Sequence, residues 1–250
     1  MGAKASERAD EVRALRLGVD LGLRIIDTAE MYDRAEEVVG EAVTGRRDEV
    51  TLVSKVLPTN ASYRGTIEAA ERSLRRLRTD RIDLYLLHWR GGHPLEETRA
   101  AFEQLQADGK IVEWGVSNFD VAGLNEPGLA TPACDQVLFN LQRRGCEWDL
   151  LPHCRERGIP VMAYSPLEQA RLEVRPALRE VAERLAATPY QVALAWVLER
   201  EDLVAIPKAV RGEHVRENAA AAALTLRADD HARLDADYPP PDGPTPLETL

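Results

Sequence analysis

Short runs of Val, Ile and Leu alternate with amphipathic segments along almost the whole chain of 250 residues, and this alternation limits the folds open to it. Apolar strands that alternate with helices are typical of a parallel sheet covered by helices. We expect strands over residues 23–27, 50–55, 82–88, 111–116, 136–139, 161–164 and 203–206. We expect helices over residues 6–21, 35–43, 62–77, 95–107, 147–157, 175–185 and 189–199, a short one near residue 121, and two more that begin near residues 214 and 229.

The number and order of these strands favour a (β/α)₈ TIM barrel that is incomplete, with its first strand missing. No G-x-G-x-x-G follows a strand, which weakens a Rossmann interpretation, and no repeat or break divides the chain. Residues 1–250 are therefore expected to form a single barrel domain. We find about seven strands where such a barrel needs eight, and the chain opens on a helix. An open barrel would leave two strand edges unpaired, so the strand is replaced, the edges meet by distortion, or another chain covers them.

Composition and charge exclude several classes of partner. The net charge is -10, aromatic residues make up 5% of the chain and no basic stripe is present, which argues against nucleic acid. No apolar run approaches the ~18 residues of a membrane span, and the polar first ten residues do not resemble a signal peptide. The three cysteines, Cys134, Cys146 and Cys154, lack metal-ligand spacing and indicate a reduced, cytoplasmic setting without a metal site.

Polar side chains end three consecutive strands. Because side chains alternate along a strand, Asp27, Lys55 and His88 each share a face with mostly apolar residues two and four positions earlier. Tyr32 lies five residues beyond Asp27. A strand-terminal Asp taken alone is as well explained by a helix cap. Three such ends in consecutive units instead predict a site, because barrel enzymes carry their catalytic residues at the carboxyl ends of strands.

The chemistry open to these four residues is protonation of an oxyanion. A phenol has an ordinary pKa near ~10, and a nearby ammonium favours the phenolate and lowers that pKa. Asp27 would neutralise and orient Lys55, and His88 would donate a hydrogen bond to a carbonyl oxygen. Tyr32 would then be the general acid, a role that contributes roughly 10²–10⁴ in rate. The set contains no activated serine or cysteine and does not match a zinc site.

Six segments carry a resemblance to a known family. They are IDTAEMY at 26–32, VSK at 53–55, DLYLLHW at 83–89, GVSNF at 115–119, AYSPL at 163–167 and IPK at 206–208. From about residue 10 to the tail the chain resembles the aldo/keto reductases, and within them the small bacterial enzymes related to the diketogluconate reductases. The resemblance implies NAD(P)H-dependent reduction of aldehydes or ketones on a (β/α)₈ barrel. It also implies that Asp27, Tyr32, Lys55 and His88 form the catalytic tetrad, with Tyr32 as the proton donor.

The same resemblance implies a set of cofactor contacts and favours NADPH over NADH. Lys208 would meet the 2′-phosphate, His214 stands where the family usually has an arginine, and a helix starting near Gly212 would offer its N-terminus to an anion. The implied contacts are Ser117, Asn118, Gln136 and Tyr164 for the nicotinamide, Ser165 and Leu167 for the pyrophosphate, and Lys208, Arg211, His214, Glu217 and Asn218 for the adenosine end.

Simpler interpretations exist for several of these residues. Ser117 and Asn118 could cap the short helix that follows them, Tyr164 could fill the core, and Lys208 could be a solvated surface lysine. Trp89 could line the substrate pocket or only pack. Trp114, Trp148 and Trp196 are expected to pack, and the three cysteines to be buried or half-buried.

The chain departs from the family pattern in two ways. It lacks the first barrel strand that the family has at its start, and its loops after Tyr32 and Tyr164 are short. A start codon assigned too late would explain the first departure equally well. The leading hypothesis is a carbonyl reductase acting on a small substrate, as a monomer or weak homodimer. The alternatives are a catalytically weak cofactor-binding protein that acts as a redox-sensing or partner-binding module, and a non-functional truncated product.

Overall fold

The computed structural model describes residues 7–250. The chain divides into two compact units, and each is described by itself. The first unit ends at Asp135 and takes in residues 210–212, and the second comprises residues 136–209 and 213–250.

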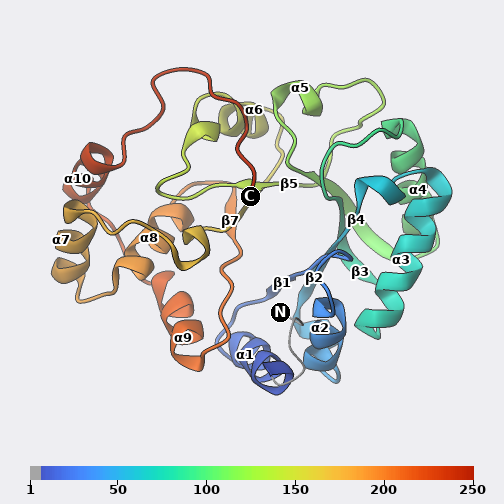
Figure 1. The fold of residues 1–250 in the computed structure, drawn as a ribbon, viewed down its shortest axis with the longest axis horizontal. Coiled ribbons are helices and arrows are strands. Elements are labelled where there is room, and N and C mark those ends of the chain that lie inside the picture. The colour runs from blue at the N-terminus through green and yellow to red at the C-terminus, as the bar shows by residue number, and fades with distance from the viewer. Residues whose placement is uncertain (1–6) are drawn as a thin grey trace. The chain divides into compact units, whose positions relative to one another are not determined.

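The first unit contains four parallel strands connected by helices (Figure 1). Its elements are α1 (Arg8–Asp20), β1 (Ile25–Asp27), α2 (Ala35–Val43), η2 (Arg47–Glu49), β2 (Thr51–Val56), η3 (Pro58–Asn60), α3 (Tyr63–Leu77), β3 (Ile82–Leu87), α4 (Leu95–Ala107), β4 (Ile111–Ser117) and α5 (Val121–Leu124). The strands pair in chain order, with Asp27 beside Val53, Lys55 beside Leu86, and Leu87 beside Val116. This register brings the carboxyl ends of β1, β2 and β3 to one edge.

Local chemistry explains where the helices of this unit lie. The hydroxyl of Ser62 caps α3 by accepting a hydrogen bond from the amide of Gly65 at 3.1 Å. Arg78, with φ at 55°, ends the same helix in the left-handed conformation. The helix buries its apolar face against the strands, so that Leu77 is fully buried, as is Leu52 on β2. In Figure 1, α2, α3 and α4 lie in a row along the strands.

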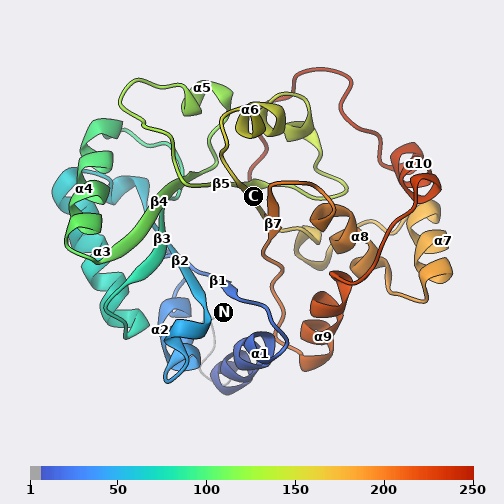
Figure 2. The same cartoon turned by 180° about the vertical axis from the view of Figure 1, so that it is seen from behind.

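The second unit contains three strands and a group of helices, which are most easily followed in Figure 2. Its elements are β5 (Asp135–Leu138, which starts at the last residue of the first unit), η4 (Gly145–Glu147), α6 (Leu150–Glu156), β6 (Val161–Tyr164), η5 (Glu168–Ala170), α7 (Pro176–Leu185), α8 (Pro189–Leu198), β7 (Leu203–Ala205), α9 (Gly212–Ala221, which starts at the last residue of the 210–212 segment) and α10 (Ala228–Asp237). Strands β6 and β7 are parallel, and α7 packs against α8 and α10.

Most of the expected elements are confirmed. The described residues contain seven strands at the expected places. The expected start of the first helix at Ser6 lies outside the described residues. Two expectations about residues 147–157 are wrong. The helix expected over 147–157 begins only at Leu150, after the short turn η4. Trp148 does not pack, since 47% of it is exposed.

The prediction that a first strand is missing is also not supported. Ile25–Asp27 is extended and paired along its whole length with β2, so a first strand, β1, is present despite its three residues. Among the described residues, no helix is both long enough and apolar enough to cross a membrane.

Candidate active site

The first unit brings together Asp27 and Lys55 at the carboxyl ends of β1 and β2. The Lys55 ammonium is fully buried and lies 2.6 and 2.7 Å from the two carboxylate oxygens of Asp27. It donates a third hydrogen bond, 3.0 Å long, to the carbonyl of Thr28. Burial lowers the pKa of Lys55 below its ordinary 10.5, and the charge of Asp27 opposes that shift. An ammonium with three acceptors at this depth is held in one position.

Tyr32 and His88 complete a group of four. The Tyr32 hydroxyl lies 3.4 Å from Nε2 of His88, and the two rings meet edge to face with centroids 5.6 Å apart. The Lys55 ammonium lies 5.3 Å from the centre of the Tyr32 ring. Tyr32 is 39% exposed, whereas Lys55 is buried beneath it. The phenol is therefore the member of the group that an incoming molecule can reach.

His88 is held as a neutral imidazole. Burial and, to a smaller extent, the charge of Lys55 lower its pKa to about 3. Its Nδ1 is buried without a hydrogen-bond partner in the described part of the chain. A neutral imidazole carries one proton, and Nδ1 has no acceptor to hold it, so the proton is best placed on Nε2. From there it can be donated toward Tyr32 or toward a bound oxygen atom.

Glu30 holds the loop that carries Tyr32, and sequence reasoning missed it. One of its oxygens accepts hydrogen bonds from the Leu57 amide at 2.7 Å and from Nδ2 of Asn60 at 2.9 Å. The other oxygen lies 3.4 Å from the Arg72 guanidinium. The backbone amide of Glu30 also donates to the Lys55 carbonyl. The only signal in the sequence was a Glu between the predicted Asp and Tyr, and the residues that Glu30 contacts lie 27 to 42 positions away.

Ser117 and Asn118, two of the expected nicotinamide contacts, lie beside this group. The Asn118 amide donates to the carbonyl of His88 at 3.0 Å and to the Ser117 hydroxyl at 3.1 Å. Asn118 has a left-handed backbone, with φ at 60°. It turns the chain where β4 ends and links that turn to β3. Arg211, which the resemblance placed near the phosphate, also belongs to the first unit and is exposed.

In the second unit, Gln136 and Tyr164 lie on neighbouring strands. Gln136 is buried on β5, and its amide contacts the sulfur of Met162 at 2.9 Å. Tyr164 ends β6 and is half-buried, and burial raises the pKa of its hydroxyl to about 12. Ser165 and Leu167 follow directly. The expected pyrophosphate contacts therefore lie at the carboxyl end of β6.

The segment that contains Ser165 has an unusual backbone. Four of its residues other than glycine have left-handed φ angles: 47° at Ser165, 49° at Glu168, 53° at Gln169 and 63° at Ala170. Each such residue costs about 1–2 kcal/mol relative to the right-handed region. Such a conformation persists only where surrounding contacts enforce it, and it occurs most often at functional sites.

The residues expected at the adenosine end lie in the segment after β7 and in α9. Lys208 follows β7 and is exposed. His214, in the first turn of α9, is exposed as well, while Glu217 and Asn218 are half-buried further along the helix. The donor set fits a nicotinamide dinucleotide phosphate, because cations and a helix N-terminus suit a phosphate, and the side-chain amides of Asn118 and Gln136 suit a carboxamide.

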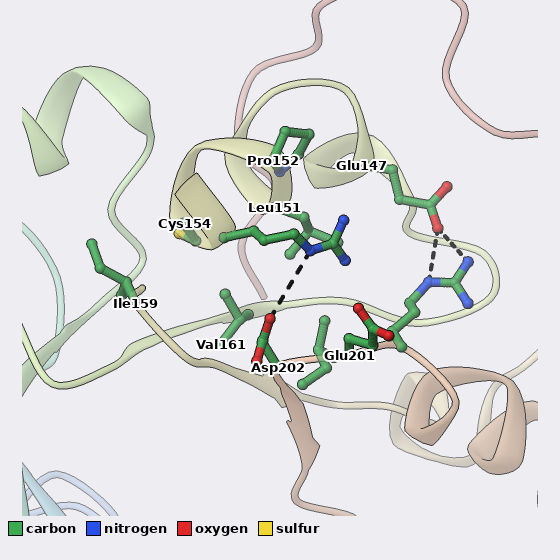
Figure 3. Close-up of a pocket in the computed structure, with 11 residues that line it drawn as sticks. Glu147, Leu151, Pro152, Cys154, Ile159, Val161, Glu201 and Asp202 are labelled. Atoms are coloured by element: carbon green, nitrogen blue, oxygen red, sulfur yellow. Dashed lines mark hydrogen bonds and ion pairs between the residues drawn. The ribbon is translucent and has the colours of Figure 1, made fainter. Parts of the chain in front are cut away.

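A separate cavity of about 160 Å³ lies in the second unit (Figure 3). Val161 and Leu203, at the amino ends of β6 and β7, line it, together with Cys154 of α6. Its rim carries Glu147 and Asp202, each paired with a guanidinium. Because the cavity lies at the amino ends of the strands, away from Tyr164, it is not part of the candidate active site.

Comparison with known proteins places this geometry in a family. The model of the aldo/keto reductase family matches residues 1–238, and the chain belongs to that family. It is 51% identical over 261 aligned residues to methylglyoxal reductase YeaE of Escherichia coli, an alignment that covers all of this chain and 92% of that enzyme. It is 35% identical to glyoxal reductase of Bacillus subtilis, over 93% of this chain and 85% of that enzyme.

Solved structures agree with this assignment. An aldo/keto reductase of Klebsiella pneumoniae, solved with NADP and acetate, superposes with a TM-score of 0.97 at 48% identity. That match covers all of this chain and 92% of the other. The thermostable aldo-keto reductase Tm1743 gives a TM-score of 0.86 at 39% identity, over 93% of this chain and 89% of the other. The similarity confirms the expected fold class, the α/β barrel of this family.

Proposed function

We propose that this protein is an NADPH-dependent carbonyl reductase that converts aldehydes or ketones to alcohols. Membership of the aldo/keto reductase family and the similarity to enzymes solved with NADP support the reaction and the cofactor. The observation that carries the assignment of residues is the convergence of Asp27, Tyr32, Lys55 and His88. The side chains that end three strands, Asp27, Lys55 and His88, converge on the exposed phenol of Tyr32, and the arrangement suits protonation of a carbonyl oxygen.

The proposed mechanism follows from the positions of these groups. Tyr32 donates its hydroxyl proton to the carbonyl oxygen as negative charge develops on that oxygen. Lys55 stabilises the phenolate that remains, and Asp27 holds the ammonium in place. His88, neutral and protonated on Nε2, donates a hydrogen bond to the same oxygen and orients it. The bound cofactor supplies the hydride that reduces the carbonyl carbon.

The proposed cofactor contacts are the ones that the family resemblance named. Ser117, Asn118 and Gln136 would hold the carboxamide, and Tyr164 would stack on the ring. Ser165 and Leu167 would contact the pyrophosphate. The adenosine end would be held by Lys208, Arg211, His214, Glu217 and Asn218. Lys208 and the start of α9 support a preference for NADPH, since a 2′-phosphate needs cationic or amide donors.

The substrate we propose is a small dicarbonyl of the methylglyoxal or glyoxal class. The support is the identity of 51% and 35% to reductases named for these compounds. We further propose that residues 1–250 act as one domain, as a monomer or a weak homodimer. The three buried cysteines, which form no disulfide among the described residues, support a reducing compartment such as the cytoplasm.

Replacing Tyr32 by Phe tests the mechanism. The variant should bind NADPH with unchanged affinity, measured by fluorescence titration, and should lose at least ~100-fold in kcat for methylglyoxal. The loss is expected because the ring remains while the proton donor is removed. A Tyr32→Phe protein with wild-type kcat would show that the phenol is not the acid. Tight NADPH binding without turnover of any carbonyl would instead favour the non-catalytic alternative, for which the geometry offers no support.

A further inference from the structure

The segment Ser165–Ala170, called left-handed here for its four residues with positive φ, is held by a side chain of its own. Glu168 lies within it, and the residue is only 6% exposed. One of its oxygens lies 2.7 Å from Nδ2 of Asn140, and the other lies 3.0 and 3.2 Å from the guanidinium of Arg143. A buried carboxylate is costly without partners, and here both oxygens have them.

The side chain of Asn140 also bonds to the backbone of two segments, the one that contains Ser165 and its own turn. Its Nδ2 also donates to the carbonyl of Ser165 at 3.0 Å, and its Oδ1 accepts from the amides of Gln142 and Arg143 at 2.9 and 3.0 Å. Asn140 is fully buried. The first and fourth residues of the left-handed segment are therefore tied to one amide, which is itself fixed to its own turn.

We propose that Glu168 is a positioning residue for cofactor binding: through Asn140 and Arg143 it keeps Ser165–Ala170 in the strained form that receives the cofactor's pyrophosphate. The proposal rests on the proposed function, which places the pyrophosphate at Ser165 and Leu167. The physical reason is that a left-handed run of side-chain-bearing residues would relax without the clamp. The binding-competent form would then be only a fraction of the population, and the apparent affinity would fall by that fraction.

The second ion pair of Arg143, with Glu248, offers a matched control. Arg143 lies 2.7 Å from Glu248, but both partners of that ion pair are about 40% exposed, at 39% and 43% of their side chains. Exposed pairs contribute little. Glu248→Gln therefore removes a charge partner from the same guanidinium and leaves the buried clamp intact.

The experiment is NADPH titration and steady-state kinetics on Glu168→Ala, Glu168→Gly, Arg143→Met and Glu248→Gln. Glu168→Ala should raise the Kd for NADPH about 10-fold, which corresponds to a competent population near one tenth. Glu168→Gly should raise the Kd less, because glycine adopts the left-handed conformation without strain. Their kcat at saturating NADPH should stay within about twofold of wild type, since the tetrad is untouched. Glu248→Gln should bind NADPH as the wild type does. Arg143→Met should resemble Glu168→Ala, because it breaks the same clamp.

Three outcomes would overturn the proposal. Glu168→Ala could bind NADPH as tightly as wild type, which would show that the backbone needs no clamp. In Glu168→Ala, kcat at saturating NADPH could fall by as much as the affinity for NADPH, which would show that Glu168 does not act through cofactor binding alone. Arg143→Met could weaken binding far more than Glu168→Ala, which would make the arginine itself the phosphate ligand. Glu168→Gly also relieves the left-handed strain, so it serves where Glu168→Ala does not fold. If the wild type itself neither binds NADPH nor turns over methylglyoxal, the proposed function fails separately.

Discussion

Replacing Asp27 by Asn should strongly destabilise the protein, because it removes the countercharge of a fully buried ammonium. Lys55 is 0% exposed and Asp27 10% exposed at the side chain, with the two oxygens 2.6 and 2.7 Å from the nitrogen. Breaking a buried ion pair by removing one partner costs about 3–5 kcal/mol. Lys55 can avoid being an unpaired buried charge only by losing its proton. From an ordinary pKa of 10.5, this deprotonation costs about 5 kcal/mol at pH 7. The unpaired charge and the deprotonation therefore lead to a similar loss of unfolding free energy.

The double variant separates stability from activity. Asp27→Asn with Lys55→Met leaves no charge in the site, so its stability should recover to within about 2 kcal/mol of wild type. The coupling between the two changes should then be at least ~2 kcal/mol in urea unfolding at pH 7. Turnover should not recover, because the positive charge that stabilises the Tyr32 phenolate is gone.

The single variant also has a pH signature. In Asp27→Asn the folded state holds Lys55 neutral, while the unfolded chain protonates it below 10.5. The unfolded state then binds the extra proton, so stability rises with pH, by up to about 1.4 kcal/mol per unit between pH 7 and 10. A deficit in Asp27→Asn below ~1 kcal/mol, or one that does not change over this pH range, would refute the reasoning.

Two other predictions concern the same unit. Glu30→Ala should lower kcat about 10- to 100-fold with unchanged Kd for NADPH, because the loop bearing Tyr32 loses its anchor, whereas Glu30→Gln keeps an acceptor and should retain most of the activity. Wild-type kcat in Glu30→Ala would contradict this role. The pKa of His88 is about 3 in the folded protein and 6.5 in the unfolded chain, so its contribution to stability is lost as pH falls from 6.5 toward 3. Between pH 7 and 5 the wild type should therefore lose about 2 kcal/mol more than His88→Gln in urea unfolding. Equal losses in the two proteins would show that the imidazole is not held neutral by burial.

Local sequence pattern was sufficient for the elements and for the strand ends. The runs around Ile25, Val53 and Leu86 are apolar and short, and each proved to be a strand because a period of two on a buried sheet leaves few other solutions. Asp27, Lys55 and His88 could be singled out because each ends such a run. The prediction of a missing first strand is not supported, because the expected strand around Ile25 pairs with β2 along its length and is itself the first strand.

The amino-acid sequence thus determined the order of strands and helices and the identity of the groups that end the strands, because both depend on neighbours within a few residues. The tertiary structure alone decided that the Tyr32 hydroxyl lies near His88, that His88 is neutral, and that Glu30 and Glu168 hold two loops in place. Burial and hydrogen-bond partners 25 or more residues away govern these properties, and no local pattern carries that information.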